Sequence, residues 1–420
     1  MKKKAAALAV GALFAAPAAH AQITFGNEQI GTVQIYGKLY PQVGYFKADG
    51  ATQPGTPVSN LISASGVLGG GPVANHGARL SVDTQNSYVG FRGERAFGGT
   101  GFKGLWQVEQ SVGLDGTGDV WSNRNSFVGL GHKVFGTIKL GNMDTIYKEY
   151  GDTFSMFGIS SGNFVSASNV LSHIGVGNNG AARFHERRAN SIQYQTGEFG
   201  GFQAGIQYGP DEAKGDPTRT INADLLSYGV KWDSERFYVS LHQERHNDFF
   251  GGSLNIPDGT VANVTTATAP TSLASSKDTA TRLSAEFRFL GSQRIVGDVA
   301  MLEYKESGQV GAGRFAKYEK VNWAIGWDGG FGPWRVAVQY LMAGEGDCER
   351  TGGVVCSTTG LEATMITAGV RYRFDRQTFV YFIAALLEND PSARMDNWAN
   401  GSPSRGADPQ QFALGISYSF

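Results

Sequence analysis

The residues of this sequence whose types and spacing indicate a function are charged side chains. They do not form a recognisable catalytic set. The longest connection between strand-like segments, residues 144–188, carries the carboxylates Asp144, Glu149 and Asp152. The basic residues expected to face them across a common space are Lys38, Arg92, Lys139, Arg187 and Arg188. Opposed patches of charge at a narrow passage select ions at close range. The alternative is a solvated surface loop whose charges have no specific role.

Motifs for catalysis are weak. Residues 99–104 match the spelling GxGxxG, but a dinucleotide site needs this motif to open a helix, and here it runs into Phe102, Trp106 and Val108 at strand spacing. The histidines at 173, 185, 242 and 246 form no helical pair with a glutamate, and no G-x-S-x-G elbow occurs. We therefore expect no enzyme activity, no cofactor and no metal site.

The two cysteines, Cys348 and Cys356, lie close together in a glycine-rich segment. In an exported protein such a pair favours a local disulfide that clamps a loop tip. The alternative is a metal-binding pair, for which the sequence offers no further ligands nearby.

The N-terminus has the three parts of a secretory signal peptide. Lys2, Lys3 and Lys4 precede a run of small apolar residues, and Ala19-His20-Ala21 has the A-x-A form of a cleavage site. A membrane anchor is the weaker alternative, because the run is too short to span about 30 Å of hydrocarbon. We expect residues 1–21 to be removed and residues 22–420 to form a single domain. The net charge is −1, or −4 without those three lysines, so no nucleic-acid partner is indicated.

The elements that would position the charges are strands with two different faces. In the last ten residues, Phe412, Leu414, Ile416, Tyr418 and Phe420 share one face, and small or polar residues share the other. Further segments that alternate in this way include residues 202–208, 282–289, 321–328 and 366–374. Such segments are about ten residues long, which is the length a tilted strand needs to cross a bilayer. Residues 378–387, apolar on both faces, indicate an additional packed surface.

Connections between these segments alternate between short and long. Seven are short turns, each near an aromatic residue, at residues 97–99, 133–135, 198–200, 233–235, 290–292, 329–331 and 375–377. Eight are long and polar, at residues 47–78, 113–122, 144–188, 209–223, 246–279, 305–317, 343–362 and 388–409. Short turns on one side and long loops on the other are typical of outer-membrane barrels. The sequence therefore predicts an all-β fold, a sixteen-stranded antiparallel transmembrane β-barrel. A soluble all-β protein with irregular insertions is the alternative.

Five segments carry a family resemblance. These are residues 33–37 (VQIYG), 106–111 (WQVEQS), 125–130 (NSFVGL), 135–145 (FGTIKLGNMDT) and 188–194 (RANSIQY). Together with the terminal Phe420 they resemble general porins of the betaproteobacterial type. The resemblance implies a homotrimer of barrels embedded in outer-membrane lipid, a third loop folded inward as a constriction, and recognition of Phe420 by the barrel-assembly machinery. One departure is Asn142, where the family often has arginine.

The expected function is passive diffusion of small hydrophilic solutes and ions through the outer membrane. Strand parity places about twice as many bases as acids on the lumenal face, so a weak anion preference is expected. A solute-specific channel with an aromatic sliding surface is one alternative. A barrel adhesin or enzyme that uses the long outer loops, among them 47–78 and 246–279, is another.

Overall fold

The computed structural model describes residues 23–27, 29–71, 73–114, 122–159, 163–177, 180–212, 214, 222–256, 274–396 and 403–420. The expected signal peptide, residues 1–21, lies outside the described residues. Every strand in the described part of the chain belongs to one sheet, and every pairing in it is antiparallel. Within these ranges, no helix combines the length and apolar character needed to cross a membrane.

Twenty strand segments make up the sheet. In chain order they are β1 (Ile23–Asn27), β2 (Gly31–Leu39), β3 (Pro41–Asp49), β4 (His76–Thr84), β5 (Tyr88–Ala96), β6 (Phe102–Ser111), β7 (Ser126–His132), β8 (Gly136–Asp144), β9 (Arg187–Gln195), β10 (Phe202–Gly209), β11 (Asp224–Asp233), β12 (Phe237–Asn247), β13 (Ser275–Phe289), β14 (Gln293–Ser307), β15 (Phe315–Phe331), β16 (Trp334–Ala343), β17 (Asp347–Arg350), β18 (Ala363–Arg373), β19 (Thr378–Asn389) and β20 (Asp408–Ser419).

These segments combine into sixteen strands that cross the wall of the barrel, as the sequence predicts. β2 and β3 form one crossing strand interrupted at Tyr40, because β2 pairs with β5 while β3 pairs with β4. β4 and β5 are likewise the two halves of the next crossing strand. The short segments β1 and β17 pair only with β2 and β15 respectively, and the sequence analysis did not foresee them.

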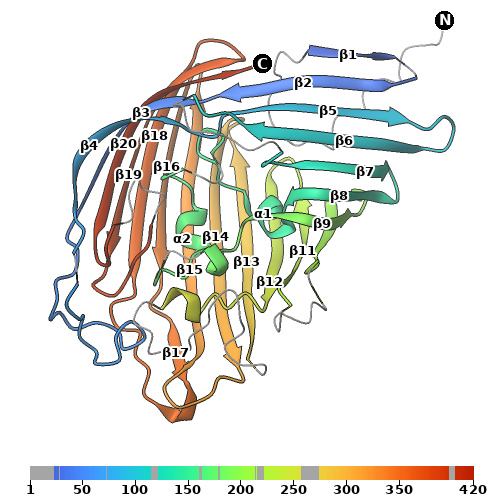
Figure 1. The fold of residues 1–420 in the computed structure, drawn as a ribbon. Helices are drawn as coiled ribbons and strands as arrows, with labels where there is room; N and C mark the ends of the chain where they lie inside the picture. Colours follow the sequence, from blue (N-terminus) through green and yellow to red (C-terminus); the bar gives the residue numbers. More distant parts are fainter. Residues whose placement is uncertain are drawn as a thin grey trace, which may run out of the picture.

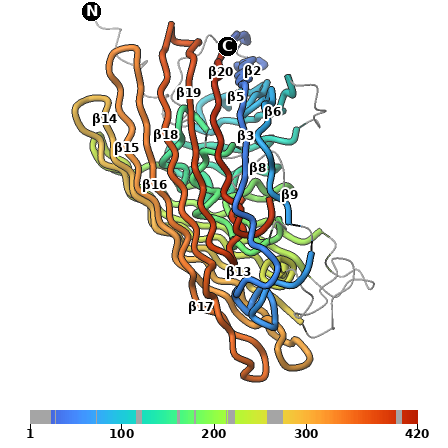
Figure 2. The backbone as a smooth tube through the Cα atoms, turned by 90° about the vertical axis from the view of Figure 1, so that its left-hand side faces the viewer, coloured from blue at the N-terminus to red at the C-terminus, as the bar shows by residue number. Residues whose placement is uncertain are grey.

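The barrel closes where the two ends of the chain meet. β20 pairs with β19 on one side, and on the other it pairs with β3 and β2, with Asp408 opposite Asp49 and Ser419 opposite Lys38. Phe420 adds two backbone hydrogen bonds to Gly37, of 2.9 and 3.0 Å. Figure 2 shows β20 running beside β3 and β2. Closure leaves no open sheet edge at this seam, as a lipid environment requires.

Short turns and long connections alternate as the sequence predicts, with one shift. The turn expected at residues 329–331 lies two residues later, because β15 continues to Phe331 and pairs there with Trp334 of β16. The long connection after β8 contains α1 (Ile146–Gly151), α2 (Ser168–Leu171) and η1 (Gly180–Ala182). In Figure 1 both helices lie within the outline of the strands.

The two faces of the crossing strands meet different surroundings. On β14 the outward Met301 is 60% exposed, while the neighbouring lumenal Leu302 is 1% exposed. β19 shows why residues 378–387 are apolar on both faces: Phe382 points outward, and Ile383 packs beneath the inward loop in a cluster with Phe157. The second apolar face of β19 therefore packs on the loop inside the barrel.

Candidate constriction site

The connection from Thr145 to Glu186, which we call the inward loop, packs against the inside of the barrel. It begins with α1, where the Thr145 hydroxyl accepts a hydrogen bond from the backbone N–H of Lys148 at 3.3 Å and so caps the helix. Ile146, Tyr147 and Tyr150 are fully buried between α1 and the wall. α1 contacts β10 to β13, and α2 contacts β15 and β16. The inward fold implied by the resemblance is thus the arrangement observed.

Glycines of the wall make room for the apolar side chains of the inward loop. A Cβ atom at Gly326 of β15 would lie 2.7 Å from the Phe154 ring, and one at Gly369 of β18 would lie 2.7 Å from the Phe157 ring. At Gly205 of β10 the nearest atom would be the Ile146 Cδ1, at 2.6 Å. Real Cβ contacts this short do not occur, so these positions need glycine for the loop to dock.

Hydrogen bonds from wall side chains hold the backbone of the inward loop. Ser227 of β11 accepts from the Tyr147 N–H at 2.8 Å, and Tyr238 of β12 donates to the Tyr150 carbonyl at 2.7 Å. Further along, Asn322 donates to the Val170 carbonyl at 2.8 Å and Gln339 to the Val165 carbonyl at 2.7 Å. Because the loop bonds to four separate strands, its path along the wall is fixed.

The three predicted acids have three different surroundings. Asp144 ends β8 and is ion-paired with Lys148 at 3.0 Å and with Arg187 at 2.9 Å, so its charge is compensated. Glu149 on α1 is exposed, and its carboxylate accepts a hydrogen bond from Gln195 at 2.8 Å. Asp152 is paired with His185 at 2.7 Å. Burial raises the pKa of Asp152, but His185 and Lys148 outweigh it and hold this pKa below its usual value.

Three of the predicted bases rest against aromatic rings. Lys139 of β8 lies 5.1 Å from the Phe127 ring centroid and donates to Gln193 at 3.0 Å. Arg92 of β5 lies over the Tyr36 ring at 4.6 Å and donates to Gln34 at 2.8 Å. Arg188 of β9 lies over the Phe249 ring at 5.4 Å. Ring faces stabilise a cation without cancelling its charge.

Lys38 and Arg187 were expected to line the pore wall, but both side chains are held by contacts with other residues. Lys38 is only 9% exposed, lying over the Tyr40 ring at 4.1 Å with its Nζ 3.5 Å from the Gly158 carbonyl of the inward loop. Arg187 binds Asp144 and Asn125, with its Nε 2.8 Å from the Asn125 Oδ1. Lys38 therefore supports the loop at Gly158, and Arg187 anchors the start of the loop at Asp144.

A network of ion pairs lies beneath the inward loop on β13 to β16. Arg282 binds Asp298 at 2.9 Å, and both side chains are buried. Arg294 bridges Glu286 and Asp328, each at 3.0 Å, and donates to the Thr153 carbonyl of the loop at 3.0 Å. Neither Arg294 nor Asp298 was among the residues predicted from the sequence, although extending the alternation through residues 293–307 would have placed both on the lumenal face.

The aromatic residues of the inward loop do not form a surface along the passage. Tyr147 and Tyr150 are fully buried, and Phe154 and Phe157 are 6% and 4% exposed. Their rings fill the space between the loop and the wall, where Tyr147, Phe154 and Phe157 belong to the apolar clusters that fix the loop. A sliding surface for one solute class, expected under the solute-specific alternative, is not what these four rings provide.

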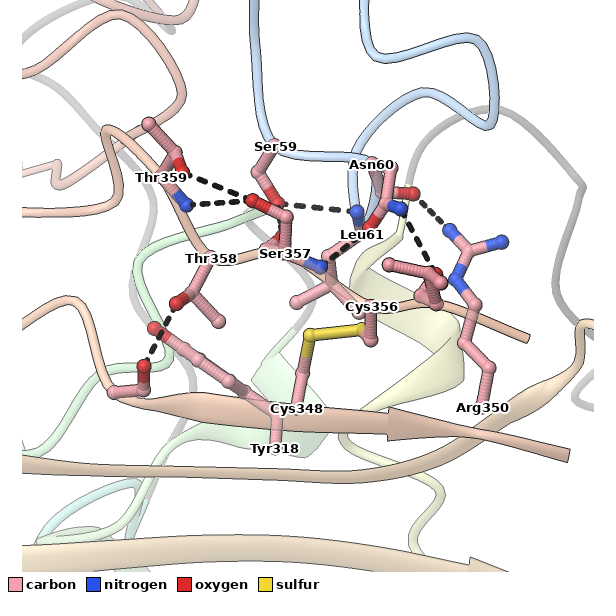
Figure 3. Close-up of a disulfide and its surroundings, with 12 residues drawn as sticks. Ser59, Asn60, Leu61, Tyr318, Cys348, Arg350, Cys356, Ser357, Thr358 and Thr359 are labelled. Carbon is pink, nitrogen blue, oxygen red and sulfur yellow. Dashed lines mark hydrogen bonds between the residues drawn. A yellow bond between two sulfur atoms is a disulfide. The ribbon is translucent and has the colours of Figure 1, made fainter. Parts of the chain in front are cut away.

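The cysteine pair forms the disulfide expected from the sequence. Cys348 on β17 and Cys356 are bonded, with their Cα atoms 5.6 Å apart. The Asn60 side chain donates to the Val355 carbonyl at 2.8 Å and accepts from the Ser357 N–H at 2.6 Å, and Arg350 donates to the Asn60 carbonyl (Figure 3). The disulfide thus constrains a loop that is hydrogen-bonded to the first long loop of the chain through Asn60.

The long outer loops pack on one another. Ser59 donates from its backbone N–H to the Ser392 hydroxyl at 2.7 Å, and Thr52 donates to the Pro391 carbonyl at 2.9 Å. Arg405 reaches the Val176 carbonyl of the inward loop at 3.0 Å. We call the joined loops 50–75, 344–362 and 390–407 the outer cap. The cap connects the mouth of the barrel to the inward loop.

In the described ranges, no three histidine, cysteine, aspartate or glutamate side chains are grouped so that they could hold a metal ion. The chemistry that the arrangement supports is electrostatic. Fixed charges of both signs lie on the inner wall of the barrel and on the inward loop.

Comparison with protein families gives one match that spans most of the chain. The family model described as Gram-negative porin matches residues 5–392. Among curated proteins, the major outer membrane protein P.IB of Neisseria lactamica is 33% identical over 165 residues, which is 39% of this chain and 44% of that protein. The corresponding protein of Neisseria gonorrhoeae is 32% identical over 153 residues, 36% of this chain and 39% of that one. The chain thus matches less than half the length of these curated relatives.

Solved structures share the fold over nearly the whole chain. The anion-selective porin from Comamonas acidovorans superposes with a TM-score of 0.66 and 20% identity, covering 92% of this chain and 99% of that one. OmpT from the outer membrane of Vibrio cholerae superposes with a TM-score of 0.61 and 14% identity, covering 95% and 100%. At these identities the likeness establishes the fold alone.

Proposed function

The chain belongs to the Gram-negative porin family, and on that premise we propose that it forms a water-filled pore in the outer membrane. Small hydrophilic solutes and ions would cross it by passive diffusion. The observation that carries the proposal is the inward loop, which narrows the barrel while packing only part of its wall. A sixteen-stranded barrel is wide enough to keep an aqueous channel beside such a loop.

We propose that the open passage runs between α1 and the wall formed by β5, β8 and β9. Glu149 faces this side from α1, and it bonds to Gln195 at the end of β9. Arg92, Lys139 and Arg188 face it from the wall. These charges are partly exposed. Beneath the loop on β13 to β16 the Arg282–Asp298 pair is buried, and the partly exposed Arg294 is neutralised by Glu286 and Asp328.

The proposed selectivity is a weak preference for anions. Among the described residues no ion pair joins Lys139 or Arg188 to a carboxylate, so their positive charge acts on the passage. Of the three acids predicted on the inward loop, only Glu149 is exposed. The Comamonas neighbour is described as anion-selective, which agrees with this direction.

Planar-bilayer recording of the purified, unheated protein tests the proposal. We expect discrete current steps whose conductance rises with KCl concentration, and a zero-current potential of anion-selective sign under a KCl gradient. The absence of steps would contradict a pore, and a cation-selective sign would contradict the selectivity.

We propose that the assembled form is a homotrimer inserted through recognition of Phe420 by the barrel-assembly machinery. One solved neighbour is titled a trimer form, and this agrees with the proposal. Phe420 sits at the closing seam, where its ring covers Gly37 of β2. Native mass spectrometry of the unheated protein should give a mass of three chains, and a monomeric mass would contradict the assembly.

A further inference from the structure

The outer cap and the inward loop share one apolar cluster. Leu61 of loop 50–75 and Leu361 of loop 344–362 belong to it, together with Val176 and Phe184 of the inward loop, and all four are buried. The same cluster includes Tyr147 of α1, whose ring lies 6.3 Å from that of Phe184. Apolar packing therefore runs without a break from the outer loops to α1, which borders the proposed passage.

The disulfide packs against this cluster. Cys348 and Cys356 are partly buried, and both contact its members. Figure 3 shows the bond between β17 and residues 59–61 of the first long loop. The Ser59 hydroxyl donates to the carbonyl of Ser357, the residue after Cys356. The disulfide thus fixes the surface on which the first long loop packs.

Arg405 connects the disulfide loop to the inward loop by hydrogen bonds. The Ser392 hydroxyl donates to the Thr359 carbonyl of the disulfide loop at 2.7 Å. The buried Arg405 guanidinium donates to the Ser392 carbonyl and, at 3.0 Å, to the Val176 carbonyl of the inward loop. The carbonyl of Arg405 accepts from the Thr52 N–H at 2.9 Å. One side chain therefore holds three connections of the chain together.

The disulfide is within reach of a small thiol. Both cysteines are partly exposed, and they are the only two in the chain. A thiolate of a dithiol attacks one sulfur and forms a mixed disulfide, which the second thiol of the same reagent then displaces. Two electrons and two protons pass to the protein, which gains two thiols, and the reagent becomes a cyclic disulfide. Reduction would leave the loop of residues 348–356 without its covalent closure.

We propose that the Cys348–Cys356 disulfide is a latch that positions the constriction. With the bond intact, the outer cap holds the second half of the inward loop through the shared cluster and Arg405. Reduction by a small thiol outside the cell releases this hold. The inference rests on the proposed function, because the latch regulates the constriction of the same pore. Cys348, Cys356 and Arg405 are positioning residues in this scheme.

The first test records single-channel currents of the full-length protein before and after dithiothreitol is added to both chambers. The current noise of the open level should rise at least about twofold, because a loosened segment samples more conformations. Reoxidation should restore the low noise. Because the chain has two cysteines, the reagent acts on no other bond of the protein. The double variant C348S/C356S should have the high noise without reductant and should not respond to it.

Arg405→Met tests the route from the cap to the inward loop. The variant removes the donors to Ser392 and Val176 and should have the high noise while its disulfide remains intact, as shown by the absence of thiols that react with maleimide. Arg376→Met is the matched control, because Arg376 is exposed in a short turn at the opposite end of the barrel. It should behave as the wild type does. Equal noise in the two arginine variants would overturn the route through Arg405.

Hydrogen–deuterium exchange tests the latch without any current. The Arg394 N–H donates to the Gly175 carbonyl at 2.7 Å, and the Phe184 N–H donates to the Ser172 carbonyl at 3.1 Å. Peptides that contain these amides should exchange roughly tenfold faster after reduction, because loss of a disulfide destabilises the structure that it constrains by at least this factor. Peptides from β19 should not change.

Unchanged exchange at both amides in the reduced protein would overturn the latch, as would unchanged noise in a conducting one. If no form gives current steps, the pore itself fails, and the exchange rates alone then decide whether the cap holds the inward loop.

Discussion

Two parts of the lumenal wall carry similar numbers of basic residues but treat them differently. The covered wall, formed by β13 to β16 beneath the inward loop, pairs Arg282 with Asp298 and Arg294 with Glu286 and Asp328. The open wall, formed by β5, β8 and β9, places Lys139 and Arg188 against aromatic rings. In the proposed pore, the pairing of the charges, more than their number, would determine the field that a passing ion meets.

The contrast follows from what each wall must accommodate. Beneath the inward loop the Arg282–Asp298 pair is buried, and a buried cation without a carboxylate would be strongly destabilising. On the open wall the basic side chains are partly exposed, and a ring face is sufficient support for a cation. The covered wall therefore stabilises the loop, and in the proposed pore the open wall would act on solutes.

The largest expected effect comes from breaking a pair on the covered wall. Arg282→Met leaves Asp298 buried with only the Thr153 hydroxyl, 3.3 Å away, as its other side-chain partner. We expect the free energy of unfolding to fall by about 3–5 kcal/mol, measured by guanidinium titration of tryptophan fluorescence. The double variant R282M/D298L, which removes both charges, should recover most of the loss. An unchanged midpoint for the single variant would contradict a role for this pair in holding the wall.

A smaller effect is expected from filling the space that the loop occupies. Gly326→Ala puts a methyl group 2.7 Å from the Phe154 ring and should lower the free energy of unfolding by about 1–3 kcal/mol. Gly297→Ala is the matched control, because its nearest neighbour, the Ala324 carbonyl oxygen, would be 4.0 Å away. Equal stability of the two variants would show that the loop does not rest on Gly326.

Charge removal from the open wall should change selectivity without a comparable change in stability. In K139Q/R188Q the ratio of anion to cation permeability should fall by up to about fivefold for each charge removed, because a unit charge near 4 Å in water is worth about 1 kcal/mol. Arg335 of β16 is also ion-paired with Asp328 on the covered wall. The neutral exchange R335Q/D328N should therefore leave this ratio unchanged. Equal shifts in the two double variants, measured as zero-current potentials, would remove the distinction between the walls.

The smallest expected effect is that of Glu149→Gln. The carboxylate is exposed and bonded to Gln195, so salt screens it, and its removal should raise the anion preference by less than about twofold. The shift should be clearest at low KCl concentration. A shift toward cations would show that Glu149 does not face the passage.

The sequence predicted the strands well because side chains along each strand alternate between the lipid and the inside of the barrel. This alternation is visible in the sequence as a period of two. Met301 and Leu302 are adjacent in the chain, yet they lie on opposite sides of the wall, as alternation requires. What the sequence could not reveal depends on contacts between distant segments. The need for glycine at Gly326 arises only because Phe154, far away in the chain, docks there.

The sequence predicted the type of site, an inward loop opposite basic wall residues, but not the partners of every residue in it. The inward loop lies where the resemblance placed it, and the role of Arg92, Lys139 and Arg188 on the open wall stays a prediction. Lys38 is buried under the loop and Arg187 is neutralised by Asp144, because both positions depend on the path of the loop after Asp144. The path of the loop cannot be predicted from the positions of the charged residues in the sequence.

The measurement that most directly tests this account is the zero-current potential of a single protein preparation across a KCl gradient, with K139Q/R188Q recorded beside the wild type. The account predicts an anion-selective sign for the wild type and a shift toward the cation-selective side in the variant. A cation-selective wild type, or a variant whose potential equals that of the wild type, would contradict the claim that the open wall sets the ion preference.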